Sequence, residues 1–209
     1  MKDERRTLDQ SKARVELRQD GDSEKSLIAG TAAVFYDGTP RTEFQLDKDF
    51  VERIAPGAFD EALANDDVRG VFNHDASLIL GRTTAGTMTL RADEEGLQYE
   101  IDAPDTSVGR DLKVSLERGD VTGSSFKFRV TGENFTEEGD VLVRTITNTS
   151  LLDVGPVTFP AYTATSASVR SEGAQESRKA YEASKRDEQE ALNAKLAKVK
   201  TQARIAEIS

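Results

Sequence analysis

The sequence contains no cysteine, and His74 is the only histidine among its 209 residues. Without cysteine the chain can form no disulfide, no thiol nucleophile and no thiolate metal site. A single histidine also excludes the usual Cys/His zinc shells. We therefore expect no metal and no cofactor, and we expect the protein to be made in a reducing cytoplasm.

Long hydrophobic runs and an excess of positive charge are missing as well. The longest apolar-leaning run, residues 27–36, is far too short to span a bilayer, and the N-terminal sequence MKDERRTLDQSKARVELRQD is too charged for a signal peptide. The formal net charge is −10, and because residues 171–209 are nearly neutral, the acidic excess lies in the body of the chain. We expect a soluble protein that binds neither nucleic acid nor membrane.

Composition and pattern divide the chain into a body and a tail. We expect an N-terminal segment with a first strand in residues 1–25, the main domain in residues 26–170, and a charged helical or disordered tail in residues 171–209. The apolar residues of the tail follow the 4-3-4-3 spacing of a short coiled-coil seam, at Leu192, Leu196, Val199, Ala203 and Ala206.

Alternating apolar residues predict that most of the body is strand. The predicted strands cover residues 13–20 and 26–36 (one hairpin), 68–75, 87–104 (a second hairpin), 121–132 and 140–162. A polar loop is expected at 133–139, and helical spacing predicts short helices at 57–64 and 107–118. The body is therefore predicted to be an α+β domain. We expect its sheet to close into a curled β-barrel that is surrounded by short helices.

The lone histidine lies in the sequence VRGVFNHD, residues 68–75. If a strand runs through residues 71–74, His74 and Asp75 point to opposite faces, so Asp75 is badly placed to orient the imidazole. Any carboxylate partner should then come from elsewhere in the chain. From this stretch alone, a half-buried structural histidine and a catalytic base both stay open.

A candidate nucleophile lies in the sequence GDVTGSSFKFRV, residues 119–130. Period-2 alternation places Ser124 on the core face with Phe126, and it turns Ser125 outward on the opposite face. Gly123 leaves room beside Ser125 for another backbone, which is the exposure that a nucleophilic serine needs. The alternative is an ordinary serine on the polar face of a strand.

A candidate carboxylate lies in the sequence LLDVGPVTFPAY, residues 151–162, where Asp153 is a charge inside an otherwise apolar run. Such a carboxylate costs free energy unless it has a partner, for example the Nδ1 proton of an imidazole. The alternative is a turn carboxylate that caps backbone N–H groups ahead of Gly155 and Pro156.

Four separated motifs occur in one order along the chain: DFVERIAPGAF, FNHD followed by LGR, GSSFKF, and DVGPVTFPAY. In these motifs, from about Ser26 to Ala167, the chain resembles the prohead (capsid maturation) proteases of HK97-like tailed phages. The resemblance implies a serine endopeptidase whose fold is similar to that of the herpesvirus assemblins, a curled β-barrel surrounded by helices.

The resemblance also implies roles for the three candidate residues. The histidine of the NHD motif, His74, is the general base, and the serine before the first phenylalanine of the GxSFxF motif, Ser125, is the nucleophile. The acidic residue before the PVTFPA motif, Asp153, is the third member, at a position where relatives often have glutamate.

The substrate implied by the resemblance is the major capsid protein or its scaffolding segment, cut inside the immature prohead in the host cytoplasm. Such enzymes commonly digest themselves, and we hypothesise self-cleavage near residues 170–178, where the chain is polar and low in predicted structure. The assemblin resemblance suggests a homodimer. For the tail we hypothesise recruitment into the assembling shell through helical scaffold segments, against the alternative of a solvated helix.

Two other function classes fit part of the sequence. One is a non-catalytic capsid assembly or scaffold protein built on a degenerate protease domain, although His74 and Ser125 are both present. The other is a general hydrolase of small esters, which would need a defined apolar pocket that no feature of the sequence indicates.

Overall fold

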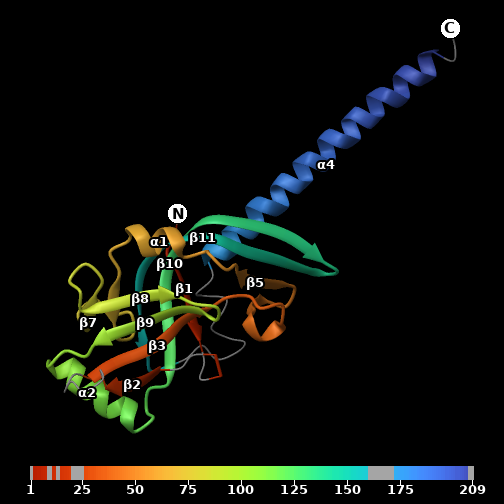
Figure 1. The fold of residues 1–209 in the computed structure, drawn as a ribbon. Helices are drawn as coiled ribbons and strands as arrows, with labels where there is room; N and C mark the ends of the chain where they lie inside the picture. The colour runs from red at the N-terminus through yellow and green to blue at the C-terminus, as the bar shows by residue number, and fades with distance from the viewer. Residues whose placement is uncertain (1, 9–10, 13–14, 20–25, 160–171, 207–209) are drawn as a thin grey trace. The chain divides into compact units, whose positions relative to one another are not determined.

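The computed structural model describes residues 2–8, 11–12, 15–19, 26–159 and 172–206. The chain divides into two compact units, Met1–Glu172 and Gly173–Ser209 (Figure 1). The first unit holds both β-sheets, and the second is formed by the long helix α4 (Glu172–Ala206). In the part of the chain that is described, no helix is both long enough and apolar enough to cross a membrane.

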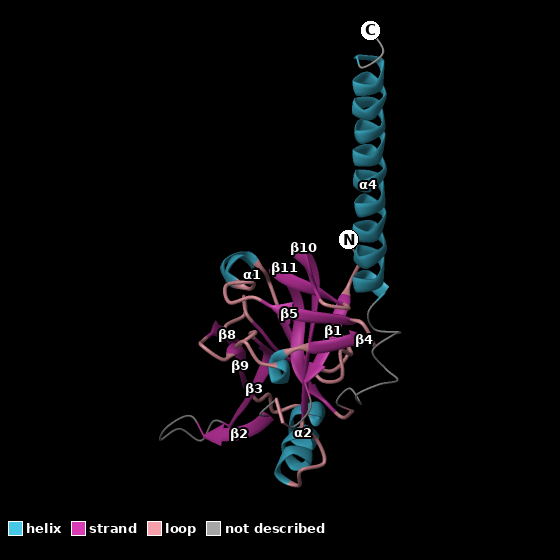
Figure 2. Ribbon diagram, turned by 90° about the vertical axis from the view of Figure 1, so that its right-hand side faces the viewer, coloured by secondary structure: helices cyan, strands magenta, loops and turns pink. Residues whose placement is uncertain are grey.

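The first unit contains two sheets. The larger sheet consists of β1 (Glu4–Leu8), β4 (Phe44–Asp47), β5 (Phe50–Ile54), β6 (Arg69–Val71), β7 (Ile79–Arg82), β10 (Gly123–Glu138) and β11 (Val141–Val157). The smaller sheet consists of β2 (Val15–Gln19), β3 (Ser26–Val34), β8 (Met88–Ala92) and β9 (Gly96–Asp102). The helices α1 (Asp60–Asn65) and α2 (Ser107–Glu117) lie at opposite ends of this unit in both views (Figures 1 and 2).

The long pair β10 and β11 forms the middle of the larger sheet. The strand order is β1-β10-β11-β5-β4, and the short strand β6 pairs with both β11 and β7. Most of the pairing is antiparallel, but β5 and β6 both run parallel to β11. The smaller sheet is antiparallel throughout, in the order β2-β3-β9-β8.

Aromatic residues of β10 form the centre of the core. Phe126 and Phe128 are fully buried with their rings stacked 4.7 Å apart, and Phe126 meets Phe59, at the start of α1, edge-on at 5.8 Å. Ser124, on the same face, donates a 3.3 Å hydrogen bond to the hydroxyl of buried Tyr99. The core face predicted for this strand is therefore confirmed.

Four charged residues are buried together between β1, β5 and β11. Arg6 bonds both oxygens of Glu52 at 2.6 Å, and Arg144 bonds Glu52 at 2.8 Å and Glu4 at 2.9 Å. None of the four is more than 5% exposed, and Arg144 also reaches the partly exposed Glu133 at 2.6 Å. We call Glu4, Arg6, Glu52 and Arg144 the buried charge cluster.

Ion pairing in the cluster opposes the effect of burial on the pKa values of Arg6 and Glu4. Burial by itself would lower the pKa of Arg6, but the adjacent carboxylates of Glu52 and Glu4 raise it above the usual value. Burial would likewise raise the pKa of Glu4, but the guanidinium groups of Arg144 and Arg6 hold it below the usual value. The two positive and two negative groups therefore balance.

The predicted α+β class is confirmed, as are the two predicted hairpins, which are β2–β3 and β8–β9. The curled barrel is not confirmed, because the strands that the structure describes form two sheets and no closed barrel. The polar loop predicted at 133–139 is wrong, since β10 continues to Glu138 and only Gly139 and Asp140 join it to β11. The first helix begins at Asp60 rather than residue 57.

Removing one member of the buried charge cluster should destabilise the fold. We expect Glu52→Ala to lower the free energy of unfolding by about 3–5 kcal/mol, because it leaves the two buried guanidinium groups of Arg6 and Arg144 with one buried carboxylate, Glu4, between them. The control Glu138→Ala breaks an ion pair between Arg53 and a carboxylate that is 52% exposed, and should change stability little. Urea unfolding measures both variants, and equal losses would show that burial of the cluster is unimportant.

Candidate active site

The three candidate residues meet where β6, β10 and β11 adjoin. His74 Nε2 lies 2.6 Å from Ser125 Oγ, and His74 Nδ1 is hydrogen-bonded to Asp153 Oδ1. A carboxylate can only accept, so the neutral imidazole carries its proton on Nδ1 and turns the lone pair of Nε2 toward the serine hydroxyl. This order of groups is the one in which an imidazole can take a proton from a hydroxyl.

The pairing of β10 with β11 places the hydroxyl and the carboxylate on one face. Ser125 lies opposite Gly155, and Lys127 lies opposite Asp153. Residues two apart on a strand share a face, so Ser125 and Asp153 point to the same side of the sheet, with one residue pair between theirs. The side chain of Asp153 is 15% exposed and faces His74 rather than solvent.

His74 comes from a turn and not from a strand. The prediction of a strand through residues 71–74 is wrong, because β6 ends at Val71 and both Asn73 (φ 55°) and His74 (φ 59°) adopt left-handed conformations. Asp75 accepts hydrogen bonds from the backbone N–H and the hydroxyl of Ser77. The prediction that Asp75 does not orient the imidazole is therefore confirmed.

Hydrogen bonds of Asn73 hold this turn against the end of β11. Its backbone N–H donates to Pro156 O at 3.0 Å, and its side chain exchanges two bonds with Thr158 at 2.8 and 3.0 Å. Left-handed backbone is unfavourable for residues other than glycine, and asparagine tolerates it best. Asn73 thus both adopts the strained conformation and supplies the contacts that offset its cost.

Gly155 allows the approach of β6 that brings the turn into place. Its φ is +155°, and a Cβ at this position would lie 2.1 Å from Val71 O. A larger residue would push the end of β6 away from β11, together with the turn that carries His74. The sequence motif contains Gly155, but the close approach of Val71 cannot be read from it.

Ser125 is not exposed, contrary to the prediction. It is completely buried, because β1 pairs with β10 and places Thr7 opposite it. Ser125 Oγ donates a 2.8 Å hydrogen bond to the backbone oxygen of Arg6 and lies 3.1 Å from Thr7 Oγ1. The sequence reasoning missed β1, which is too polar to show a strand pattern.

A small cavity of about 160 Å³ opens beside the imidazole. It is lined by Arg5, Thr7, Asn73, His74, Val157 and Phe159. Phe159 is 73% exposed, so the cavity has an apolar wall that reaches the surface. Its size suits one amino-acid side chain rather than a large ligand.

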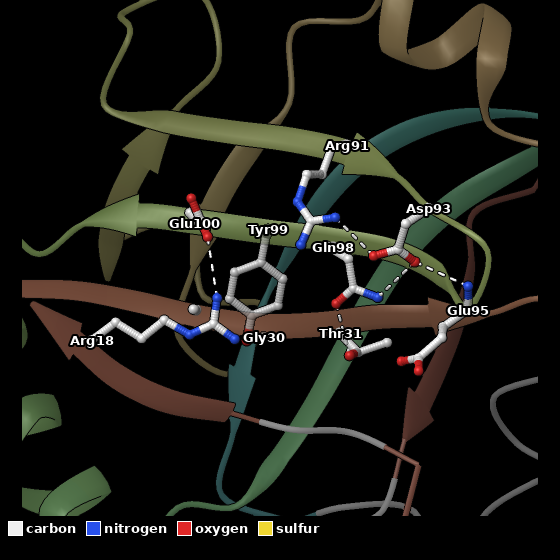
Figure 3. Close-up of a pocket in the computed structure, with 10 residues that line it drawn as sticks. Arg18, Gly30, Thr31, Arg91, Asp93, Glu95, Gln98, Tyr99 and Glu100 are labelled. Atoms are coloured by element: carbon white, nitrogen blue, oxygen red, sulfur yellow. Dashed lines mark hydrogen bonds and ion pairs between the residues drawn. The ribbon is translucent and has the colours of Figure 1, made fainter. Parts of the chain in front are cut away.

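A second cavity lies on the smaller sheet (Figure 3). Its polar groups bond one another, through the pairs Arg91–Asp93, Thr31–Gln98 and Arg18–Glu100. It contains none of the three candidate residues. Within the described ranges, no group of three or more His, Asp or Glu side chains could hold a metal ion.

Comparison with known proteins links the chain to tailed phages. The model of the family described as "Caudovirus prohead serine protease" matches residues 13–180. No curated protein matches. Among solved structures, the capsid assembly protease of bacteriophage T4 is similar at 11% sequence identity and a TM-score of 0.43, over 75% of this chain and 99% of that chain.

The proton position on the lone imidazole can be measured directly. We expect a two-dimensional ¹H–¹⁵N spectrum, at the alkaline end of the titration, to show the single histidine as the Nδ1–H tautomer, because Asp153 accepts that proton. Asp153→Asn should shift the population toward Nε2–H, while Asp75→Asn should leave it unchanged. A dominant Nε2–H tautomer in the unaltered protein would contradict the described hydrogen bonds.

Proposed function

Because this chain belongs to the caudovirus prohead serine protease family, we propose that it is a serine endopeptidase that cleaves the capsid scaffold during prohead maturation. Ser125 is the nucleophile, His74 the general base and Asp153 the third member of the triad. The observation that carries this proposal is the continuous chain of hydrogen bonds from Asp153 through the imidazole to Ser125 Oγ.

The geometry supports the usual two-step acyl transfer. Ser125 Oγ attacks the scissile carbonyl carbon while its proton passes to His74 Nε2, and that proton then goes to the leaving amine as the C–N bond breaks. Water then attacks the acyl-enzyme and gives a proton to His74, which passes it to Ser125 Oγ as the acyl C–O bond breaks. Throughout, Asp153 fixes the ring orientation and stabilises the imidazolium.

The substrate is the major capsid protein or its scaffolding segment, cut within the immature prohead in the host cytoplasm. Crowding inside the shell would favour weak homodimers by mass action. In this proposal residues 26–170 form the protease domain, and the two sheets belong to one assemblin-like curled barrel. Residues 1–25 precede this domain and add the strands β1 and β2 to its two sheets, and residues 171–209 form the tail.

Self-cleavage near residues 170–178 remains part of the proposal. Residues 170 and 171 lie outside the described residues, whereas Glu172 onward belongs to α4. A protease binds extended segments, so a cut after residue 172 would require the first turn of α4 to unwind. A lower intact mass for the unaltered protein than for Ser125→Ala would place the cut.

A non-catalytic assembly protein built on a degenerate domain is less well supported. A degenerate site has no need to keep three side chains from distant segments in one hydrogen-bonded chain. A small-ester hydrolase is also less well supported, because the cavity beside His74 is small and shares its wall with β1. Cleavage of the scaffold without turnover of small esters would separate these functions.

Substituting the triad should abolish cleavage without unfolding the chain. We expect Ser125→Ala and His74→Ala to reduce cleavage of the capsid protein of the same phage by about 10⁴-fold or more. Ser124→Ala is the matched control: this neighbouring serine faces Tyr99 instead of the imidazole, so activity should stay within about tenfold. Gel analysis of timed digests measures the rates, and retained cleavage by His74→Ala would overturn the mechanism.

The tail is expected to direct the enzyme into the shell. Leu192 and Leu196 are each half exposed on α4, as a surface that pairs with another helix would require. A chain ending at Arg170 should cleave scaffold in solution at the normal rate but be depleted from purified proheads. Leu192→Ser/Leu196→Ser should reproduce the depletion, whereas Gln189→Ser should not. Normal packaging of the shortened chain would remove the recruitment role.

A further inference from the structure

The strand β1 lies where a peptide substrate would have to bind. A protease of this kind binds its substrate in extended form, and the free edge of the strand that carries the nucleophile is the obvious place for backbone pairing. That edge of β10 is taken by β1, with Thr7 opposite Ser125 and Arg6 opposite Phe126. Ser125 is completely buried as a result.

Contacts of β1 also divert the proton that catalysis needs. The hydroxyl of Ser125 has one proton, and three possible acceptors lie within reach: His74 Nε2 at 2.6 Å, Arg6 O at 2.8 Å and Thr7 Oγ1 at 3.1 Å. Donation to Arg6 O withholds the proton from the base. With β1 in place, the serine is therefore covered, and a backbone oxygen of β1 competes with the imidazole for its proton.

Side chains of β1 line the cavity beside the imidazole. Arg5 and Thr7 point to one side of the strand and line the cavity that also contains His74. Glu4, Arg6 and Leu8 point to the other side and are buried. A substrate strand in the same register would place its alternate side chains in the same two environments.

The ion pairs of β1 are arranged so that the strand can leave β10 without leaving an unpaired charge buried in the domain. Glu4 and Arg6 form their own pair at 2.7 Å, and both would depart together. Glu52 and Arg144 would remain bonded to each other at 2.8 Å. Because each half of the buried charge cluster is neutral, separating them avoids the cost of an isolated buried ion.

Two features of the chain set β1 apart from the rest of the domain. It is an edge strand whose only described ladder partner is β10, so its departure interrupts no other ladder. It also lies before the segment matched by the family, which begins at residue 13. The matched segment therefore contains all three triad residues but not the strand that covers Ser125.

We propose that β1 is an internal occupant of the substrate site, which keeps the protease inactive until an extended substrate segment replaces it on the edge of β10. This inference rests on the proposed function. It differs from a purely structural role for β1, in which the strand would stay in place while the substrate is cut.

A reversible cross-link tests whether β1 must leave. Arg5 lies directly opposite Lys127, and the chain has no cysteine, so Arg5→Cys/Lys127→Cys creates a single disulfide that fixes β1 to β10. The control Thr89→Cys/Glu100→Cys makes an equivalent cross-link between β8 and β9 in the smaller sheet. Each variant is compared with itself, oxidised and reduced.

The readout is the rate at which a fluorophosphonate probe modifies Ser125, followed by intact mass, together with the rate of scaffold cleavage. We expect oxidation to slow both rates by at least about tenfold in the β1 variant, with recovery on reduction, and to leave the control unchanged. Equal rates in the oxidised and reduced β1 variant would overturn the inference and leave the proposed function intact. No modification of Ser125 and no cleavage in any form would overturn both.

A peptide added in trans gives a second, independent test. A chain without residues 2–8 should react faster with the probe, and a peptide of residues 2–8, KDERRTL, should inhibit it competitively. The matched peptide KDRRETL exchanges Glu4 and Arg6, which places like charges beside Glu52 and Arg144, and should inhibit at least about tenfold more weakly. Equal inhibition by the two peptides would contradict binding in the register of β1.

Discussion

The antiparallel register of β10 and β11 is the constraint on which the candidate site depends. It sets Ser125 opposite Gly155 and Lys127 opposite Asp153, so the hydroxyl and the carboxylate emerge on one face. A slip of one residue along either strand would turn one of them to the other face. The same strand β11 runs parallel to β6 at Asp153, and the chain that leaves β6 therefore passes directly over both groups. This register holds from Gly123 to Lys127, and it shifts directly beyond the site, between Lys127 and Phe128.

Strand pairing alone does not place the imidazole beside Ser125 and Asp153. If β6 continued through His74, the side chain of His74 would lie farther along the sheet. The chain instead turns sharply in left-handed conformations at Asn73 and His74, at a cost of about 1–3 kcal/mol for each residue. Three hydrogen bonds from Asn73 to the end of β11, each contributing about 1 kcal/mol, offset much of this cost. The backbone strain is thus concentrated in the turn that orients His74. Gly155 allows this turn to approach β11, because it has no Cβ that would clash with Val71 O.

Sequence periodicity was sufficient for features that depend on local pattern. It separated Ser124 from Ser125 by strand phase and found both hairpins, whereas Asp75 was rejected as a partner of the imidazole on the basis of a strand that the structure does not contain. It failed where contacts distant in the chain decide the structure. The strand β1, with the sequence ERRTL, has almost no apolar signal, because its burial depends on ion pairs with β5 and β11 instead of on hydrophobic side chains. The exposure of Ser125 was misjudged for the same reason, since β1 pairs with β10 at this residue.

An uncovered strand edge is a hazard in any protein, because it can pair with an unrelated chain. For a protease of this architecture the edge of β10 cannot simply be removed or blocked by proline, since the same edge must pair with a substrate. Covering it with a short strand that carries its own balanced charges meets both requirements: Glu4 and Arg6 make the strand soluble when released and paired when docked. The polar sequence of β1, which gives no apolar periodicity, is therefore also the property that allows β1 to cover the edge of β10 in the proposed inactive state and to leave it when a substrate binds.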